Sequence, residues 1–172
     1  MANTDSPQGL VPIASRKAYT TRKVYAQSGY ATDIFVGDAV IRATTATANT
    51  AEITTATGSY GIGSLEEVIR ASVGDTNVIL GVIVSIDPAY GVANNYGIAS
   101  TDRVITICDD PQALYEIQAD GTLGAASAGL NAVLIDTHTG STIFGTSGTE
   151  LDTTSDVPAA DASNQLIIVR AV

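Results

Sequence analysis

The most uniformly apolar part of the chain is NVILGVIVSIDP, from Asn77 to Pro88. It is rich in β-branched residues, is interrupted only by Gly81 and Ser85, and has turn residues on both sides. Short runs of this kind are typical of strands that are covered on both faces. A helix is disfavoured, because a glycine lies in mid-run and the β-branched side chains are stiff. We therefore predict a central strand here.

Other apolar or alternating segments lie between Gly, Asn, Asp and Pro turns. They are Val24–Gln27, Ile34–Val36, Ala39–Ile41, Leu65–Ser72, Arg103–Asp109, Ala113–Asp120, Leu130–Thr137 and Gln165–Val172. Gly37-Asp38 is typical of a hairpin or a bulge, and Asp120-Gly121 is a hairpin signal. Leu65–Ser72 also fits a short helix with a capping box, although a strand is favoured. We predict an all-β fold, an antiparallel β-sandwich or barrel-like body with at most one short helix.

Two stretches lack core residues and are predicted as loops. The Ala/Thr/Ser tract at 43–59 is expected to be a surface loop with room for a short ribbon. Residues 89–102 contain several Tyr/Gly turns and no periodicity, which indicates a long loop.

The first 23 residues differ from the rest. Pro7, Gly9 and Pro12 break any period, so we predict an extended N-terminal arm over 1–23, followed by a single β-rich domain over 24–172. An arm with apolar anchors lies along its own domain or along a neighbour. Its candidate contact residues are three apolar anchors and four basic residues: Leu10, Val11, Ile13, Arg16, Lys17, Arg22 and Lys23.

Charge separates the arm from the body. The whole chain of 172 residues has 8 Lys and Arg against 18 Asp and Glu, a net charge of −10. The first 23 residues hold four of the basic residues and one acidic residue, about +3, which leaves about −13 for the remainder. An acidic body repels nucleic acid and anionic membranes, so we expect neither as a partner. No signal peptide or membrane span is expected.

No constellation of catalytic residues is complete. GSTIFGTS (Gly140–Ser147) has the glycine spacing of a phosphate loop but has Thr146 in place of the lysine. His138, the only histidine, is expected to be exposed in a loop, and no nucleophile elbow accompanies it. Cys108, the only cysteine, follows RVITI and is expected to be buried and inert.

The acidic pairs are also better explained by local structure than by catalysis or metal binding. Asp109 and Asp110 precede a proline at a strand end, which is ordinary turn chemistry, and Trp platforms for sugars are missing. Asp152 and Asp156 do not match a calcium loop. We expect no enzyme activity, no cofactor and no metal.

Several motifs occur in an order that resembles a known family. They are the opening MANTDSPQGLVPI, IFVGDAVI at 34–41, ILGVIVSIDP at 79–88, ASTDRVITICDDPQALYEIQADG at 99–121, GLNAVLIDT, GSTIFGTSGTELD and the closing QLIIVRAV. The chain resembles the head decoration, or cement, proteins of tailed bacteriophages along almost its whole length. It departs from the pattern by a longer Ala/Thr tract at 43–57.

The resemblance implies a structural protein of the virion, made in the host cytoplasm. It would bind the outside of the shell formed by the major capsid protein and clamp neighbouring capsomers against internal DNA pressure. We expect a homo-oligomer, either a dimer or a trimer, since symmetric shells offer positions for both. With the arm as the clamp, deleting residues 1–23 is expected to leave a folded body that no longer binds shells.

A tail- or fibre-associated module that binds carbohydrate or a host surface is the alternative. It would need aromatic platforms, for which Tyr60, Tyr90 and Tyr96 are the candidates.

Overall fold

The computed structural model describes residues 6–14, 19–44, 49–72, 78–88, 94–161, 164 and 166–171. Within these residues the chain forms short strands and one 3-10 turn, Ala125–Ser127. The strands are β1 Val11–Ala14, β2 Thr21–Ala26, β3 Ala39–Arg42, β4 Ile53–Thr55, β5 Gly58–Tyr60, β6 Val68–Arg70, β7 Gly81–Ile86, β8 Arg103–Cys108, β9 Leu114–Glu116, β10 Asn131–Ala132, β11 Leu134–Ile135, β12 Glu150–Leu151 and β13 Leu166–Ile167. The all-β prediction is confirmed.

The main element is a five-stranded antiparallel sheet in the order β2-β8-β7-β3-β6. Its two edge strands meet, because Tyr25 in β2 forms a parallel bridge with Glu67 and its N–H donates to Glu66 O at 2.9 Å. The sheet is therefore closed into a small barrel. The predicted central strand is confirmed, since β7 is the third of the five strands.

Alternate residues of the barrel strands point to its inside and outside. The interior is a cluster of aliphatic side chains: Val24, Ala26, Ile34, Val40, Val68, Ile83, Ile105 and Ile107. Residues between them face outward, and Ala39, Ile41 and Val82 pack with Leu134 in a second cluster. Both faces of the sheet are covered, which explains why β7 reads as one apolar run.

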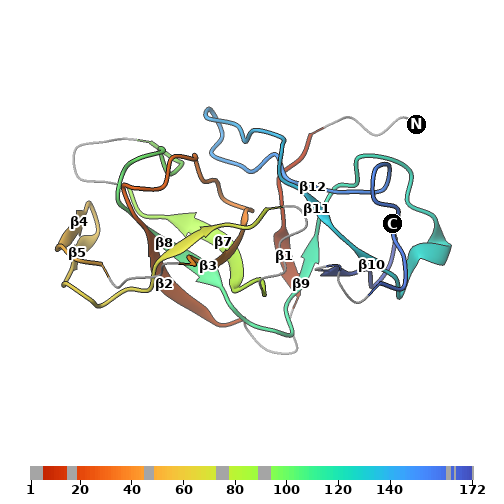
Figure 1. Cartoon of the computed structure of the whole chain (residues 1–172), viewed down its shortest axis with the longest axis horizontal. Coiled ribbons are helices and arrows are strands. Elements are labelled where there is room, and N and C mark those ends of the chain that lie inside the picture. The colour runs from red at the N-terminus through yellow and green to blue at the C-terminus, as the bar shows by residue number, and fades with distance from the viewer. Residues whose placement is uncertain are drawn as a thin grey trace.

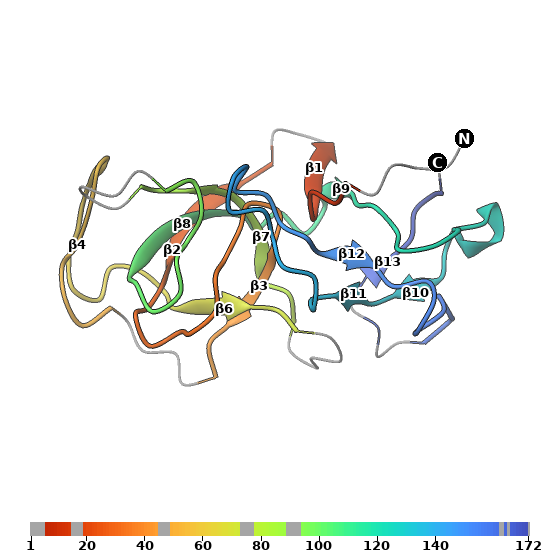
Figure 2. The same cartoon turned by 90° about the horizontal axis from the view of Figure 1, so that it is seen from above.

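Three two-stranded pairs, β1·β9, β10·β13 and β11·β12, make up the other half of the molecule. Figures 1 and 2 show the β1·β9 ribbon between the barrel and the C-terminal pairs, and the β4·β5 ribbon at the opposite end. The Ala/Thr tract does end in a short ribbon, β4·β5, as predicted, but the prediction that it lacks core residues is wrong, because Ala43 and Ile53 are buried. The last predicted strand, Gln165–Val172, is reduced to β13.

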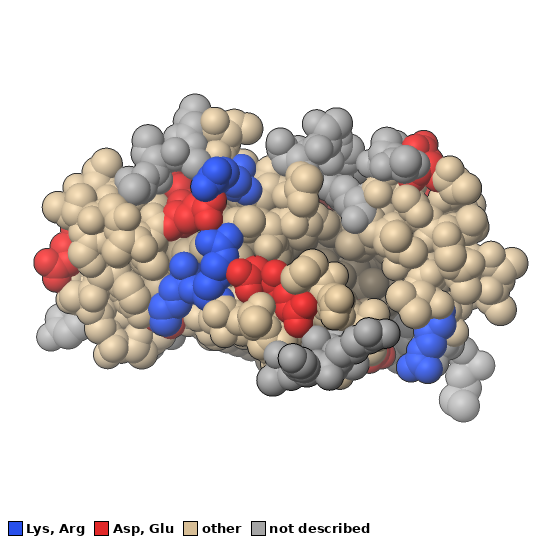
Figure 3. All heavy atoms as spheres, turned by 90° about the horizontal axis from the view of Figure 1, so that it is seen from below, with Lys and Arg blue, Asp and Glu red and all other residues tan. Residues whose placement is uncertain are grey.

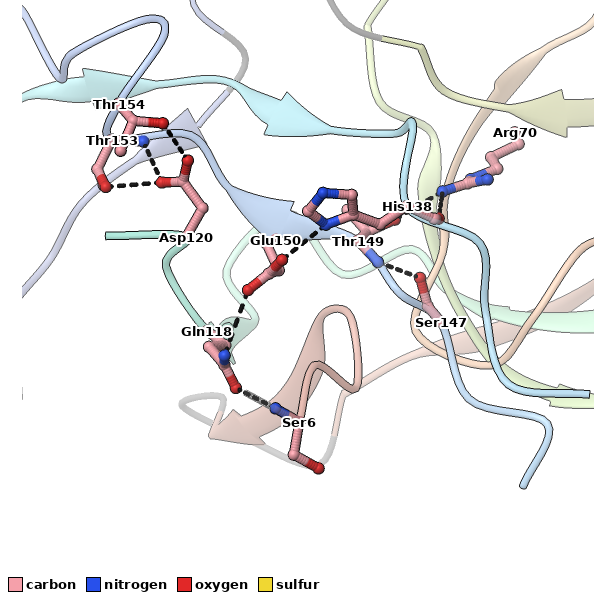
Figure 4. Close-up of polar contacts among 10 residues, drawn as sticks. All are labelled: Ser6, Arg70, Gln118, Asp120, His138, Ser147, Thr149, Glu150, Thr153 and Thr154. Carbon is pink, nitrogen blue, oxygen red and sulfur yellow. Dashed lines mark hydrogen bonds and ion pairs between the residues drawn. The ribbon is translucent and has the colours of Figure 1, made fainter. Parts of the chain in front are cut away.

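Of two turn predictions, one is confirmed and one is wrong. Gly37 and Asp38 both lie opposite Ile83, because the Gly37 N–H donates to Ile83 O and the Ile83 N–H donates to Asp38 O, each at 2.9 Å. With Gly37 at a φ of +96°, this is the predicted β-bulge rather than a hairpin. Asp120-Gly121 forms no hairpin. The Asp120 carboxylate instead accepts hydrogen bonds from Thr153 N at 2.8 Å and Thr153 Oγ1 at 2.7 Å, so it stabilises a turn far along the sequence (Figure 4).

The boundary predicted after residue 23 does not coincide with the end of an element. Strand β2 begins at Thr21 and pairs with β8 over its whole length, from Thr21↔Cys108 to Ala26↔Arg103. Arg22 and Lys23 therefore belong to the barrel. Strand β1, within the predicted arm, pairs with β9 and so lies along its own domain.

Candidate functional site

The N-terminal segment is fixed to the body where it crosses Gly37. Leu10 N–H donates to Gly37 O at 2.9 Å, and the Leu10 side chain is 2% exposed. Gly9 and Gly37 both have positive φ angles, +69° and +96°. A Cβ on Gly9 would lie 2.5 Å from Gly37 O, and one on Gly37 would lie 2.3 Å from Gln8 O. Only glycine at both positions permits this approach.

Beneath the crossing lies a buried carboxylate. Asp38 is fully buried and accepts hydrogen bonds from Phe35 N at 2.8 Å and Ser147 Oγ at 2.5 Å. Arg70 Nε lies 3.3 Å from the same carboxylate. Burial raises the pKa of Asp38, and the nearby Arg70 and the hydrogen bonds oppose that effect. Asp38 thus joins the turn after Phe35, strand β6 and the loop at Ser147.

After the crossing, the chain enters the β1·β9 ribbon, which carries exposed apolar side chains. Val11 is 39% exposed, Ile13 is 50% exposed and Leu114 is 41% exposed. We call these three side chains the ribbon patch. Among the described residues, β1 pairs with no strand other than β9. The ribbon therefore presents apolar surface on a paired and anchored strand.

A series of polar contacts connects the residues next to the β1·β9 ribbon with strand β12 (Figure 4). Ser6 N–H donates to Gln118 Oε1 at 3.3 Å, and Gln118 Nε2 donates to Glu150 Oε1 at 3.2 Å. The other Glu150 oxygen lies 2.7 Å from His138 Nδ1. The residues before β1, those after β9 and strand β12 are thereby held together.

His138 is less isolated than the sequence indicated. Its side chain is 48% exposed, as expected for a loop residue, but it forms an ion pair with the buried Glu150 when protonated. Among the described residues, no hydroxyl or thiol is hydrogen-bonded to its ring. The ion pair therefore joins the loop at His138 to Glu150, and through Gln118 to Ser6.

The two basic residues of β2 are paired within the chain. Arg22 Nη1 lies 2.7 Å from Glu66 Oε2, and its Nε lies 2.9 Å from Asp109 Oδ2. Lys23 forms an ion pair with Asp87 and lies over the Tyr60 ring, 5.2 Å from its centroid. Figure 3 shows basic and acidic side chains interleaved on one face of the molecule.

The seven predicted contact residues therefore separate into four groups. Leu10 is a core anchor and cannot touch a partner. Val11 and Ile13 are exposed on the ribbon. Arg22 and Lys23 have partners within the barrel. Arg16 and Lys17 lie outside the described residues. Leu114 was not predicted as a contact residue, although the alternation of its strand places it on the same face as the exposed Glu116.

Glu66 gives the barrel seam a pH dependence that can be measured. Burial alone would raise the pKa of Glu66, but hydrogen bonds from Arg22 and Arg42 outweigh it and lower the pKa. A lowered pKa in the folded state contributes stability above the unfolded value, and this contribution is lost as the pH falls through the folded value.

We expect Glu66→Gln to lower the free energy of unfolding by about 1 kcal/mol at neutral pH. The difference from wild type should shrink as the pH falls through the lowered folded pKa of Glu66. Urea denaturation at several pH values measures both quantities, with the exposed Glu52→Gln as control. A difference that stays constant with pH would contradict the assignment.

The loop Gly140–Ser147 does not form a phosphate site. Its backbone donors are used inside the chain: Ser141 N donates to Thr146 O at 2.8 Å, Gly145 N to Ser141 O at 2.7 Å and Ser147 N to Val36 O at 2.8 Å. Across the described part of the chain, no three His, Cys, Asp or Glu side chains are grouped to hold a metal ion. Cys108 is fully buried, as predicted.

Comparisons with known proteins identify no relative. No family model matches the chain, and no curated protein or solved structure matches it significantly. In the residues that the structure describes, no helix has the length and apolar character to cross a membrane.

Proposed function

We propose that the chain is a capsid decoration protein, located on the outside of a virion. It binds the outer surface of a shell assembled from a major capsid protein and clamps neighbouring capsomers against the pressure of packaged DNA. The order of sequence motifs supports the class of protein. The observation that carries the mechanism is the ribbon patch, Val11, Ile13 and Leu114, exposed on an anchored strand.

An anchored apolar strand suits attachment to a protein surface. Its backbone is already ordered by pairing with β9, so binding costs little further conformational entropy. Pro12 has no N–H and cannot donate a backbone hydrogen bond, so β1 pairs poorly with strands of other molecules. Contact is therefore made by side chains. Each copy needs only a modest interface, because many copies act together on a shell, and we propose that the protein binds as a dimer or a trimer.

The carbohydrate-binding alternative receives less support. Tyr60 packs beside the barrel, with its hydroxyl donating to Asp87 Oδ2 at 3.3 Å. Tyr96 stacks on Phe35, with ring centroids 5.3 Å apart. Tyr90 lies outside the described residues. Two of the three candidate platforms are thus engaged within the chain.

Co-sedimentation with shells of the major capsid protein tests this function. Wild type should bind, and Val11→Ser/Ile13→Ser should bind at least about tenfold more weakly, because roughly 1.4 kcal/mol or more of apolar burial is lost. Val157→Ser, which changes another side chain that is 64% exposed, is the matched control and should bind as wild type does. Absence of wild-type binding would overturn the proposed function, and full binding by the double variant would overturn the role of the ribbon patch.

A further inference from the structure

The loop Gly140–Ser147 presents two large apolar side chains to solvent. Ile143 is 79% exposed and Phe144 is 76% exposed. In the sequence, this loop was interpreted as an incomplete phosphate loop and as one motif of the family resemblance. The available signal was an adjacent Ile and Phe in a stretch otherwise built of Gly, Ser and Thr. Isolated apolar side chains are common on surfaces, whereas an adjacent pair at the tip of a loop needs an explanation.

The loop is held in one conformation. The Gly145 N–H donates to Ser141 O at 2.7 Å and the Phe144 N–H donates to Ser141 Oγ at 3.2 Å, so the turn is closed on itself. Asn95 Nδ2 donates to Ile143 O at 2.9 Å from a neighbouring segment. Gly145 has φ +73°, and a Cβ there would lie 2.4 Å from Asn95 O. The two apolar side chains are thus carried on an ordered backbone.

The base of the loop lies against the residues that precede the ribbon. At its base, Ser147 lies against Gly9, where a Cβ on the glycine would be 2.6 Å from Ser147 Cβ. Gly9 is two residues before β1, and Figures 1 and 2 both show the loop that precedes β12 beside β1. The loop and the ribbon are therefore fixed to the body at the same crossing.

Charge also distinguishes this loop. The segment from Thr139 to Thr149 contains no charged residue, although the chain carries a net charge of −10. A neutral, apolar tip can enter a protein pocket without the cost of desolvating a charge. Anionic membranes are disfavoured, because the acidic chain is repelled and membrane-surface segments are usually basic.

We propose that Ile143 and Phe144 form a plug that enters an apolar pocket on the same shell protein that the ribbon patch contacts. This inference rests on the proposed function. It adds a second contact from a different part of the sequence, which gives a clamp two points of attachment. Adjacent large side chains on an ordered loop have the character of interface hot spots, since little rotamer or loop freedom is lost on binding.

The experiment compares shell occupancy of four proteins by co-sedimentation. Ile143→Ser/Phe144→Ser should bind at least about tenfold more weakly than wild type with an unchanged Tm. Asn95→Ala, which keeps the plug but removes its brace, should bind about two- to fivefold more weakly. Ile62→Ser, a control at a side chain that is 71% exposed, should bind as wild type does.

The outcomes separate the two proposals. If wild type binds and the plug variant binds equally well, the plug is refuted while the proposed function stands. If wild type does not bind shells, the proposed function fails and the plug proposal fails with it. If the plug variant loses binding to phosphatidylglycerol vesicles but keeps full shell occupancy, the plug is a membrane contact and the proposal is overturned.

Discussion

A variant that lacks residues 1–23 should show no cooperative thermal unfolding transition. The deletion removes Leu10, whose side chain is 2% exposed, and the pairs Thr21↔Cys108, Arg22↔Ile107 and Lys23↔Thr106 from the barrel. Loss of one buried leucine costs about 3–5 kcal/mol, and the loss of half of β2 adds to it. A total of about 5 kcal/mol or more is comparable with the stability of a whole domain.

Point variants separate the anchor from the strand. Leu10→Ala should fold with a free energy of unfolding lower by about 3 kcal/mol. Val11→Ser/Ile13→Ser should stay within about 0.5 kcal/mol of wild type, because both side chains are exposed. Differential scanning calorimetry gives these values. A truncated protein that unfolds cooperatively near the wild-type Tm would show that the first 23 residues are dispensable for folding.

Gly37→Ala should lower the free energy of unfolding by about 3 kcal/mol. Part of the loss, roughly 1–2 kcal/mol, comes from a φ of +96° that alanine rarely adopts. The rest comes from the Cβ, which would lie 2.3 Å from Gln8 O, so that the backbone at the crossing must separate.

Gly129→Ala is the matched control for backbone strain. Gly129 has φ +86°, but a Cβ there would meet nothing within 4 Å. Its loss should be limited to the strain, about 1 kcal/mol. Urea denaturation of both variants measures the difference between them. Equal losses would mean that the crossing of residues 8–10 over Gly37 does not form as described.

Individual strands of the barrel could be predicted from the sequence where their hydrophobic pattern lies within a few consecutive residues. The apolar run at β7 and the alternation at β8 identify strands, because burial on one or both faces sets the period directly. Gly37-Asp38 was recognised as a hairpin or a bulge. The burial of Asp38 could not be predicted, because its partners Ser147 and Arg70 come from distant parts of the chain.

The candidate site was predicted only in part for the same reason. Val11 and Ile13 are exposed, and their role as contact residues stays a prediction, whereas Leu10 is buried within its own domain. Whether an apolar residue is an internal anchor depends on the close approach of Gly9 and Gly37, which no local pattern reveals. Likewise, the charges of Arg22 and Lys23 are paired with residues 44 and 64 positions away.

The C-terminal half shows another limit of pattern reading. Predicted strands at Leu130–Thr137 and Gln165–Val172 are present only as two-residue pairs, and Ala132 and Ile168 from these segments pack with Leu151 in a small cluster. Apolar content also overestimates burial in the last segment, where Ile167 is 69% exposed and Val169 is 63% exposed.

The most direct test of the central claim is an electron-microscopy map of capsid shells incubated with the protein. The map should show added density on the outer surface, with the β1·β9 ribbon and the loop at Ile143 and Phe144 against the shell and the β4·β5 ribbon directed away from it. Density attached through the β4·β5 end, or shells without added density at saturating protein, would contradict it.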